Sequence, residues 1–158
     1  GWPTAPHMSE PDYVTAPSTL AAHPHDGGVR LGTCRSPAHS CDAVVSLCRV
    51  GTDDYADIAA GDHIEVRLVD SPHPADNPHL GFVLADAAAV IKELRDEGKT
   101  VFVHCVAAQQ RTPSVALAYS RLLGVPADTA KADLRLALPD LRGHGPLWSA
   151  AAEVRSAS

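Results

Sequence analysis

The chain has 158 residues, of which 45% are hydrophobic and 20% are charged, and its formal net charge is −6 at pH 7. This composition predicts one globular domain with a full hydrophobic core, and the negative charge argues against a general nucleic-acid or membrane-surface binder. We find no apolar run of membrane-spanning length, no signal-peptide pattern and no paired spacing among the four cysteines, so we expect a cytoplasmic protein.

The first segment of the chain lacks any helical or strand period. Residues 1–28 are rich in Pro, Ala, His and Gly, and we interpret them as an N-terminal arm that is disordered or partly of expression-vector origin. His23 and His25 lie in this stretch, where two histidines are more often solvated than metal-bound, so no metal site is predicted. Residues 29–158 then form the folded domain.

Three segments have the pattern of β-strands. Residues 29–33 indicate an edge strand, and residues 43–50 form a continuous apolar run that is typical of a strand covered on both faces. Residues 64–69 alternate apolar and charged side chains, as a half-buried strand does.

Four later segments have helical periodicity. In residues 78–97 apolar side chains recur every three or four positions, and Gly98 ends that helix. Further helices are expected at 112–123, 126–138 and 146–154. Strands that alternate with helices predict an α/β fold, with a small, mostly parallel central sheet flanked by helices on both faces.

The stretch 100–119 combines a strand, a short loop and a helix. Residues 100–103 are β-branched and aromatic, and Pro113 suits the first turn of a helix. The loop from Cys105 to Arg111 is so short that it must curl, which turns its backbone N–H groups inward. Together with the positive end of the helix dipole, such a loop binds a dianion such as phosphate.

The side chains of this loop suggest a nucleophile and its helpers. The loop favours the thiolate form of Cys105, and the guanidinium of Arg111 can grip two phosphate oxygens at once. The hydroxyl of Thr112 can donate a hydrogen bond to the sulfur when sulfur becomes the leaving group. The phosphate-binding loop residues are Val106, Ala107, Ala108, Gln109, Gln110 and Arg111.

The order His104, Cys105, five residues, Arg111 and Thr112 resembles the signature of the cysteine-dependent protein tyrosine phosphatases, in particular their small dual-specificity branch. The resemblance implies that residues 29–158 are a catalytic domain with the phosphate loop at the carboxyl end of a central strand. It also implies hydrolysis of a phosphorylated protein or small phosphomonoester through a phosphocysteine intermediate, without metal or other cofactor.

The resemblance assigns further roles outside the loop. In these phosphatases a general-acid Asp follows the corresponding strand, and Asp70 fits that place better than its rival Asp76, which also resembles part of a helix start. His104 is expected to support the site. Some family members form a reversible disulfide between the nucleophile and a cysteine in the position of Cys48.

One residue departs from the family pattern. Ala108 occupies a position where the family usually has Gly, and a Cβ there is costly if the backbone is left-handed. An alternative interpretation is therefore a pseudophosphatase, which binds the phosphate group but hydrolyses the phosphomonoester poorly. A rhodanese-type sulfurtransferase also uses a Cys in a loop after a strand, but would not need Asp70 or Thr112.

Overall fold

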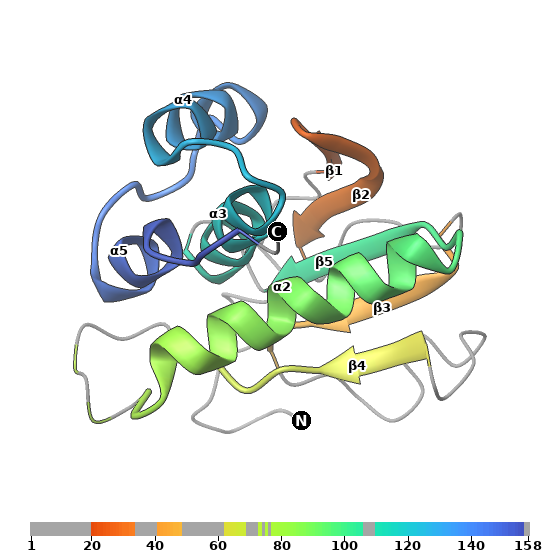
Figure 1. Cartoon of the computed structure of the whole chain (residues 1–158), viewed down its shortest axis with the longest axis horizontal. Helices are drawn as coiled ribbons and strands as arrows, with labels where there is room; N and C mark the ends of the chain where they lie inside the picture. The colour runs from red at the N-terminus through yellow and green to blue at the C-terminus, as the bar shows by residue number, and fades with distance from the viewer. Residues whose placement is uncertain are drawn as a thin grey trace, which may run out of the picture.

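The computed structural model describes residues 20–33, 41–48, 62–68, 73, 75, 77–105 and 110–156. The strands are β1 (Leu20–His23), β2 (Asp26–Thr33), β3 (Ala43–Ser46), β4 (His63–Glu65) and β5 (Val101–Cys105). The helices are α2 (Leu80–Asp96), α3 (Arg111–Leu122), α4 (Ala127–Ala137) and α5 (Pro146–Ala152). Figure 1 shows the sheet with the helices packed together against it.

The sheet is mixed and mostly parallel. Its order is β1-β2-β5-β3-β4, in which β2, β5, β3 and β4 run parallel and only β1 is antiparallel to its neighbour. All residues of β5 are buried, as the continuous apolar run 101–103 predicted. The structure thus confirms the predicted α/β class, and it places β5 at the centre of the sheet.

The N-terminal side of the sheet differs from the prediction. Residues 29–33 are not an edge strand, because they belong to β2, which lies between β1 and β5. The edge strand is β1, so the sheet begins at Leu20, within the segment that we expected to form an arm. Gly27 and Gly28 interrupt the alternating pattern from which a strand is predicted. The residues after them are buried because they pair with β5, a contact that the local sequence does not show.

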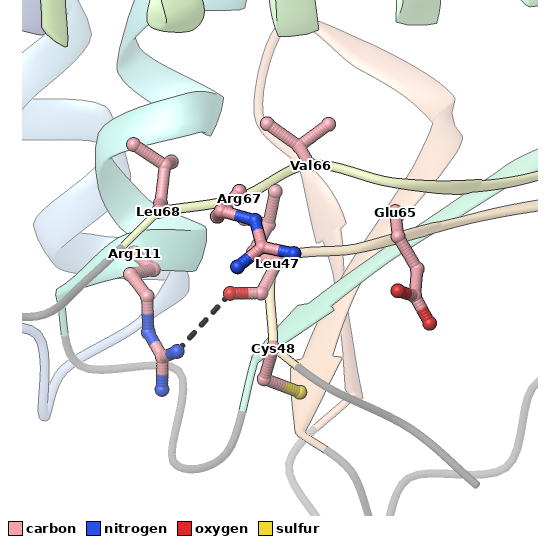
Figure 2. A pocket seen from close by; sticks show the side chains of 7 residues that line it. All are labelled: Leu47, Cys48, Glu65, Val66, Arg67, Leu68 and Arg111. Atoms are coloured by element: carbon pink, nitrogen blue, oxygen red, sulfur yellow. Dashed lines mark hydrogen bonds between the residues drawn. The ribbon is translucent and has the colours of Figure 1, made fainter. Parts of the chain in front are cut away.

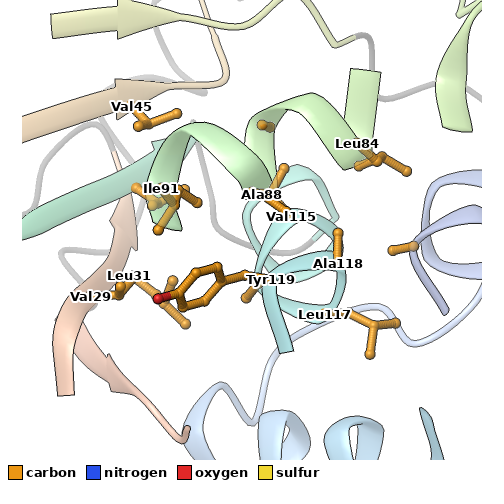
Figure 3. Close-up of a cluster of buried hydrophobic side chains, with 14 of the residues drawn as sticks. Val29, Leu31, Val45, Leu84, Ala88, Ile91, Val115, Leu117, Ala118 and Tyr119 are labelled. Atoms are coloured by element: carbon orange, nitrogen blue, oxygen red, sulfur yellow. The ribbon is translucent and has the colours of Figure 1, made fainter. Parts of the chain in front are cut away.

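The helices that the structure describes share one core with one face of the sheet. Their positions confirm the four predicted helical segments, and α2 and α3 end before Gly98 and Gly124, which have φ angles of 84° and 93°. The core contains Val29, Leu31, Val45, Ile91 and Tyr119, among others (Figure 3).

The opposite face of the sheet carries a separate cluster. It consists of Cys41, Val44 and Phe102, which alternate along the strands with the residues of the main core. Helices on this second face, which the sequence also predicts, are not among the elements that the structure describes. No helix in the described part of the chain is long and apolar enough to cross a membrane.

His23 and His25 are not solvated, contrary to the prediction. His23 is 2% exposed, donates from Nε2 to the Ala116 carbonyl at 2.9 Å and accepts at Nδ1 from the His25 backbone N–H at 3.0 Å. The His25 ring bridges the Ser120 hydroxyl and the Asp133 carboxylate at 2.8 and 2.9 Å. These bonds join the β1–β2 hairpin to α3 and α4, and they require a neutral His23.

The neutral His23 makes stability depend on pH. Burial and the nearby His25 lower the pKa of His23 from 6.5 to about 4. As the pH falls, His23 is protonated in the unfolded chain before it is protonated in the folded chain. The contribution of neutral His23 to the stability of the fold is therefore complete above pH 6.5 and is lost as the pH falls to about 4. We expect a loss of about 3 kcal/mol across this range. Urea unfolding at several pH values would measure it, and His23→Asn should flatten the curve; an equally steep curve in that variant would contradict the assignment.

Candidate active site

The predicted nucleophile and the predicted phosphate-binding arginine lie at the two ends of one loop. Cys105 is the last residue of the central strand β5 and is 2% exposed, and Arg111 is the first residue of α3. Because β2, β5, β3 and β4 are parallel, their carboxyl ends share one edge of the sheet, where α/β proteins place their sites. The first N–H groups of α3 point toward this edge without partners inside the helix.

The Arg111 guanidinium is held by the backbone of a neighbouring strand. Its Nη1 donates to the Leu47 carbonyl at 3.1 Å (Figure 2), and the Leu47 N–H in turn donates to the His104 carbonyl at 2.9 Å. Leu47 follows directly after β3, so the pairing of β3 with β5 sets the position of the guanidinium. Because only Nη1 is used in this bond, the other N–H groups of the guanidinium can donate two parallel hydrogen bonds to an oxyanion.

Thr112 lies in the first turn of α3, and its hydroxyl has no hydrogen-bond partner among the described residues. Thr112 and Ser114 are both fully buried, and within the described residues neither hydroxyl has a hydrogen-bond partner. A buried hydroxyl without a partner costs free energy, so such a group calls for an explanation. A hydroxyl that receives its partner only during a reaction would meet this requirement.

His104 is fully buried behind the nucleophile and belongs to a hydrogen-bonded chain. Its Nε2 lies 2.7 Å from the Ser46 hydroxyl oxygen, which lies 3.0 Å from Nε2 of His63. The Ser46 hydroxyl thus links the two rings, since a hydroxyl can donate to one ring nitrogen while it accepts from the other. The ring also stacks on Phe102.

Cys48 lies on the other side of His104 and faces a hollow. Its sulfur is 3.9 Å from Nδ1 of His104, and, unlike Cys41 and Cys105, its side chain is partly exposed. The hollow has a volume of about 180 Å³ and is lined by Leu47, Cys48, Glu65, Val66, Arg67, Leu68 and Arg111 (Figure 2). The predicted support residues His104 and Cys48 are thus in contact, while the disulfide between Cys48 and Cys105 stays a prediction.

Gln110, the residue that directly precedes α3, is tied to a distant segment of the chain. It is 5% exposed, precedes α3, and its Nε2 donates to the His144 carbonyl at 3.1 Å. Gly145 follows with a φ angle of 101°, which only glycine adopts readily, and its turn brings this carbonyl to the loop. The polar segment around His144 therefore helps to hold Gln110, at the start of α3, through its backbone.

Comparisons with known proteins add solved structures only, since no family model and no curated protein match the sequence. Human DUSP28 matches with a TM-score of 0.71 and 19% identity, over 89% of this chain and 95% of that chain. A mouse putative dual specificity phosphatase complexed with zinc tungstate matches with a TM-score of 0.67 and 19% identity, over 96% and 92%. The human tyrosine phosphatase-like serine/threonine/tyrosine-interacting protein matches with a TM-score of 0.65 and 15% identity, over 87% and 95%.

The chain has the dual-specificity phosphatase fold. Within this phosphatase fold, the described residues bring together Cys105, Arg111, Thr112, His104 and Cys48 at one edge of the sheet.

The remaining predicted site residues lie outside the described residues. These are the general-acid candidates Asp70 and Asp76 and the loop residues Val106, Ala107, Ala108 and Gln109. The choice between the two acids and the effect of Ala108 therefore stay predictions. No group of three or more metal-binding side chains occurs in the described part of the chain.

Three contributions to the site of this phosphatase fold were missed by sequence reasoning. Ser46 bonds to His104, and a lone hydroxyl within an apolar strand run was a signal that could have revealed it. The Leu47 carbonyl positions Arg111, but a backbone group leaves no trace in the residue pattern. Arg67 lines the hollow beside Arg111, although its place in an alternating strand indicated only exposure.

Proposed function

We propose that this protein is a metal-independent phosphomonoesterase of the dual-specificity type, which hydrolyses phosphorylated proteins or small phosphomonoesters. The observation that carries the proposal is the placement of Cys105 and Arg111 at the two ends of one strand-to-helix loop. The anchoring of Arg111 and the unpaired hydroxyl of Thr112 support it, as does the fold. The absence of paired spacing among the four cysteines of the sequence favours action in a reducing compartment such as the cytoplasm.

The reaction proceeds in two steps. The Cys105 thiolate attacks phosphorus, the bond to the ester oxygen breaks, and Asp70 donates its proton to the leaving alkoxide or phenolate. Arg111 and the N–H groups of the loop hold the three other oxygens. Water then attacks the phosphocysteine, Asp70 takes a proton from it, and the Thr112 hydroxyl donates to the departing sulfur. The products are an alcohol and inorganic phosphate.

Hydrolysis of para-nitrophenyl phosphate in the presence of EDTA tests the proposal. We expect turnover that survives chelation and a bell-shaped pH profile with a mildly acidic optimum, because the thiolate and the protonated acid must coexist. Acid quenching during turnover should trap a phosphate on the peptide that contains Cys105. Activity that needs a divalent cation, or a phosphate trapped on another residue, would contradict the mechanism.

The unpaired hydroxyl of Thr112 leads to a specific kinetic prediction. Thr112→Val keeps the side-chain shape and removes a buried hydroxyl without a partner, so we expect no loss of stability. The second step should slow by about tenfold to a hundredfold, because the leaving sulfur loses a donor. Stopped-flow assays should then show a burst of para-nitrophenol followed by slow turnover. Thr112→Ser should restore the second step, and a Thr112→Val enzyme without a burst would contradict the role.

Ala108 favours a second candidate function, that of a pseudophosphatase. A Cβ at this loop position can weaken catalysis while leaving the N–H groups that bind phosphate. One of the matching structures is also named as phosphatase-like. Ala108→Gly separates the two functions: a large gain in turnover from a nearly inactive parent supports a recognition module, and a small change supports an enzyme.

A further inference from the structure

The hollow beside Arg111 carries a second guanidinium. Arg67 lines the same hollow of about 180 Å³ as Arg111 and Leu47, all of which Figure 2 labels. In a chain with a net charge of −6, two cationic groups at one concavity form a local positive site. Because low-dielectric walls focus the field in such a hollow, it attracts anions in spite of the overall charge.

The backbone beneath Arg67 is firmly held. The side chains of Val66 and Leu68 on either side of it pack against the main core, and the Val66 N–H donates to the Ser46 carbonyl at 2.9 Å. Arg67 lies between these two residues, and its own side chain is exposed and lines the hollow. A side chain that starts from a fixed backbone loses less entropy when it grips a ligand.

The Arg67 guanidinium is uncommitted within the described residues. It is exposed and has neither a hydrogen bond nor an ion pair there, whereas Arg95 and Arg121 are each engaged by carboxylate or carbonyl oxygens. The only carboxylate that lines the hollow is that of Glu65, and Figure 2 shows it directed away from both guanidinium groups. Nothing in the described lining therefore neutralises Arg67.

From this arrangement we propose that Arg67 forms a second anion subsite next to the phosphate loop. The preferred substrates are then phosphomonoesters that carry a second anionic group, a phosphate or a carboxylate, close to the scissile phosphate. The inference rests on the proposed function, because it needs the first phosphate to bind at Arg111. Arg67 grips the second group through paired N–H donors and selects the substrate without touching the reacting atoms.

Binding to a Cys105→Ser background tests the subsite without turnover. Calorimetry with inorganic orthophosphate and pyrophosphate should give pyrophosphate about tenfold tighter binding, which corresponds to about 1.4 kcal/mol. Adding Arg67→Ala should reduce this preference to less than about threefold, because pyrophosphate loses more affinity than orthophosphate does. Glu65→Gln should raise the preference, because it removes the opposing charge. Arg155→Ala, at an exposed position near the C-terminus, is the charge-matched control and should change nothing.

The outcomes separate this inference from the function on which it rests. If Cys105→Ser binds no orthophosphate, the proposed phosphate site itself is wrong. If it binds orthophosphate but shows no pyrophosphate preference, or keeps that preference in Arg67→Ala, only the Arg67 subsite is overturned.

Turnover by the intact protein identifies the source of the second charge. Phosphotyrosine peptides with Glu or Gln beside the phosphoresidue are compared with a small bisphosphate and its monophosphate counterpart. For each pair, the kcat/KM of the substrate with the second negative group is divided by the kcat/KM of the substrate without it. The pair whose ratio falls at least about fivefold in Arg67→Ala identifies the type of substrate that Arg67 selects. Unchanged ratios in both pairs would overturn the inference.

Discussion

Cys105→Ser should abolish hydrolysis of para-nitrophenyl phosphate, with a loss of at least about a thousandfold in kcat. A serine hydroxyl is not ionised near neutral pH, so it is a far weaker nucleophile than a thiolate. Cys105 is the last residue of β5 and is buried against Thr33 of β2 in the parallel register, so replacing sulfur by oxygen leaves the strand intact. Phosphate binding, which depends on Arg111 and the loop N–H groups, should persist.

Cys41→Ser is the matched control for this substitution. Cys41 is also buried, but it belongs to the cluster with Val44 and Phe102 on the opposite face of the sheet. We expect its activity to remain within about twofold of the parent, although burial of the hydroxyl costs some stability. Equal losses in both variants would indicate damage to the fold, and full activity in Cys105→Ser would exclude Cys105 as the nucleophile.

The second large effect is expected on stability. Asp26 opens β2, and its carboxylate accepts three hydrogen bonds from Arg95 at 3.0–3.2 Å and one from the Tyr119 hydroxyl at 2.6 Å. It also accepts from the Gly28 N–H, and Gly28 lacks a Cβ where the Arg95 guanidinium packs. Asp26→Ala removes these bonds and leaves Arg95 and Tyr119 partly buried without their partner. We expect a loss of about 2–3 kcal/mol in the free energy of unfolding.

Urea unfolding at pH 7 measures this loss, with Asp96→Ala as the control. The carboxylate of Asp96 pairs with Lys92 at 2.9 Å on the exposed side of α2, the helix that also carries Arg95. Such an exposed pair contributes less than about 0.5 kcal/mol to the free energy of unfolding. Comparable losses in the two variants would contradict the central role of Asp26.

The same carboxylate adds to the acid sensitivity of the fold. Burial raises the pKa of Asp26, but the hydrogen bonds from Arg95, Tyr119 and Gly28 outweigh burial and hold the pKa below its ordinary value. A lowered pKa means that the stabilisation is present above the ordinary value near 4 and is lost as the pH falls below it. This range lies below that of His23, so acid unfolding should proceed over both ranges and Asp26→Asn should flatten only the lower one.

The hydrogen bonds of Asp26 and His23 explain why the N-terminal hairpin was not predicted. The partners that join these two residues to the helices lie on α2 and α3, about seventy to ninety positions along the chain, where no local residue pattern reveals them. Gly27 and Gly28 weaken the strand period, so only pairing with β5 makes this segment a strand.

The local parts of the site are readable from the order of residues along the chain. A buried strand, a short connection and a helix start are encoded by adjacent residues, so the sequence predicts that Cys105 ends a strand and that Arg111 and Thr112 begin a helix. The α/β class followed from the alternating periods in the same way. Each of these inferences needed only the chemistry of residues a few positions apart.

The surroundings of those residues come instead from the way the strands pair in the folded chain. The Leu47 carbonyl reaches Arg111, and the Ser46 hydroxyl reaches His104, because β3 pairs with β5 in one particular register. Arg67 joins the hollow because the chain after β4 continues beside the end of β3. Such contacts depend on backbone groups and on strand order, which many sequences share, so no residue pattern along the chain specifies them.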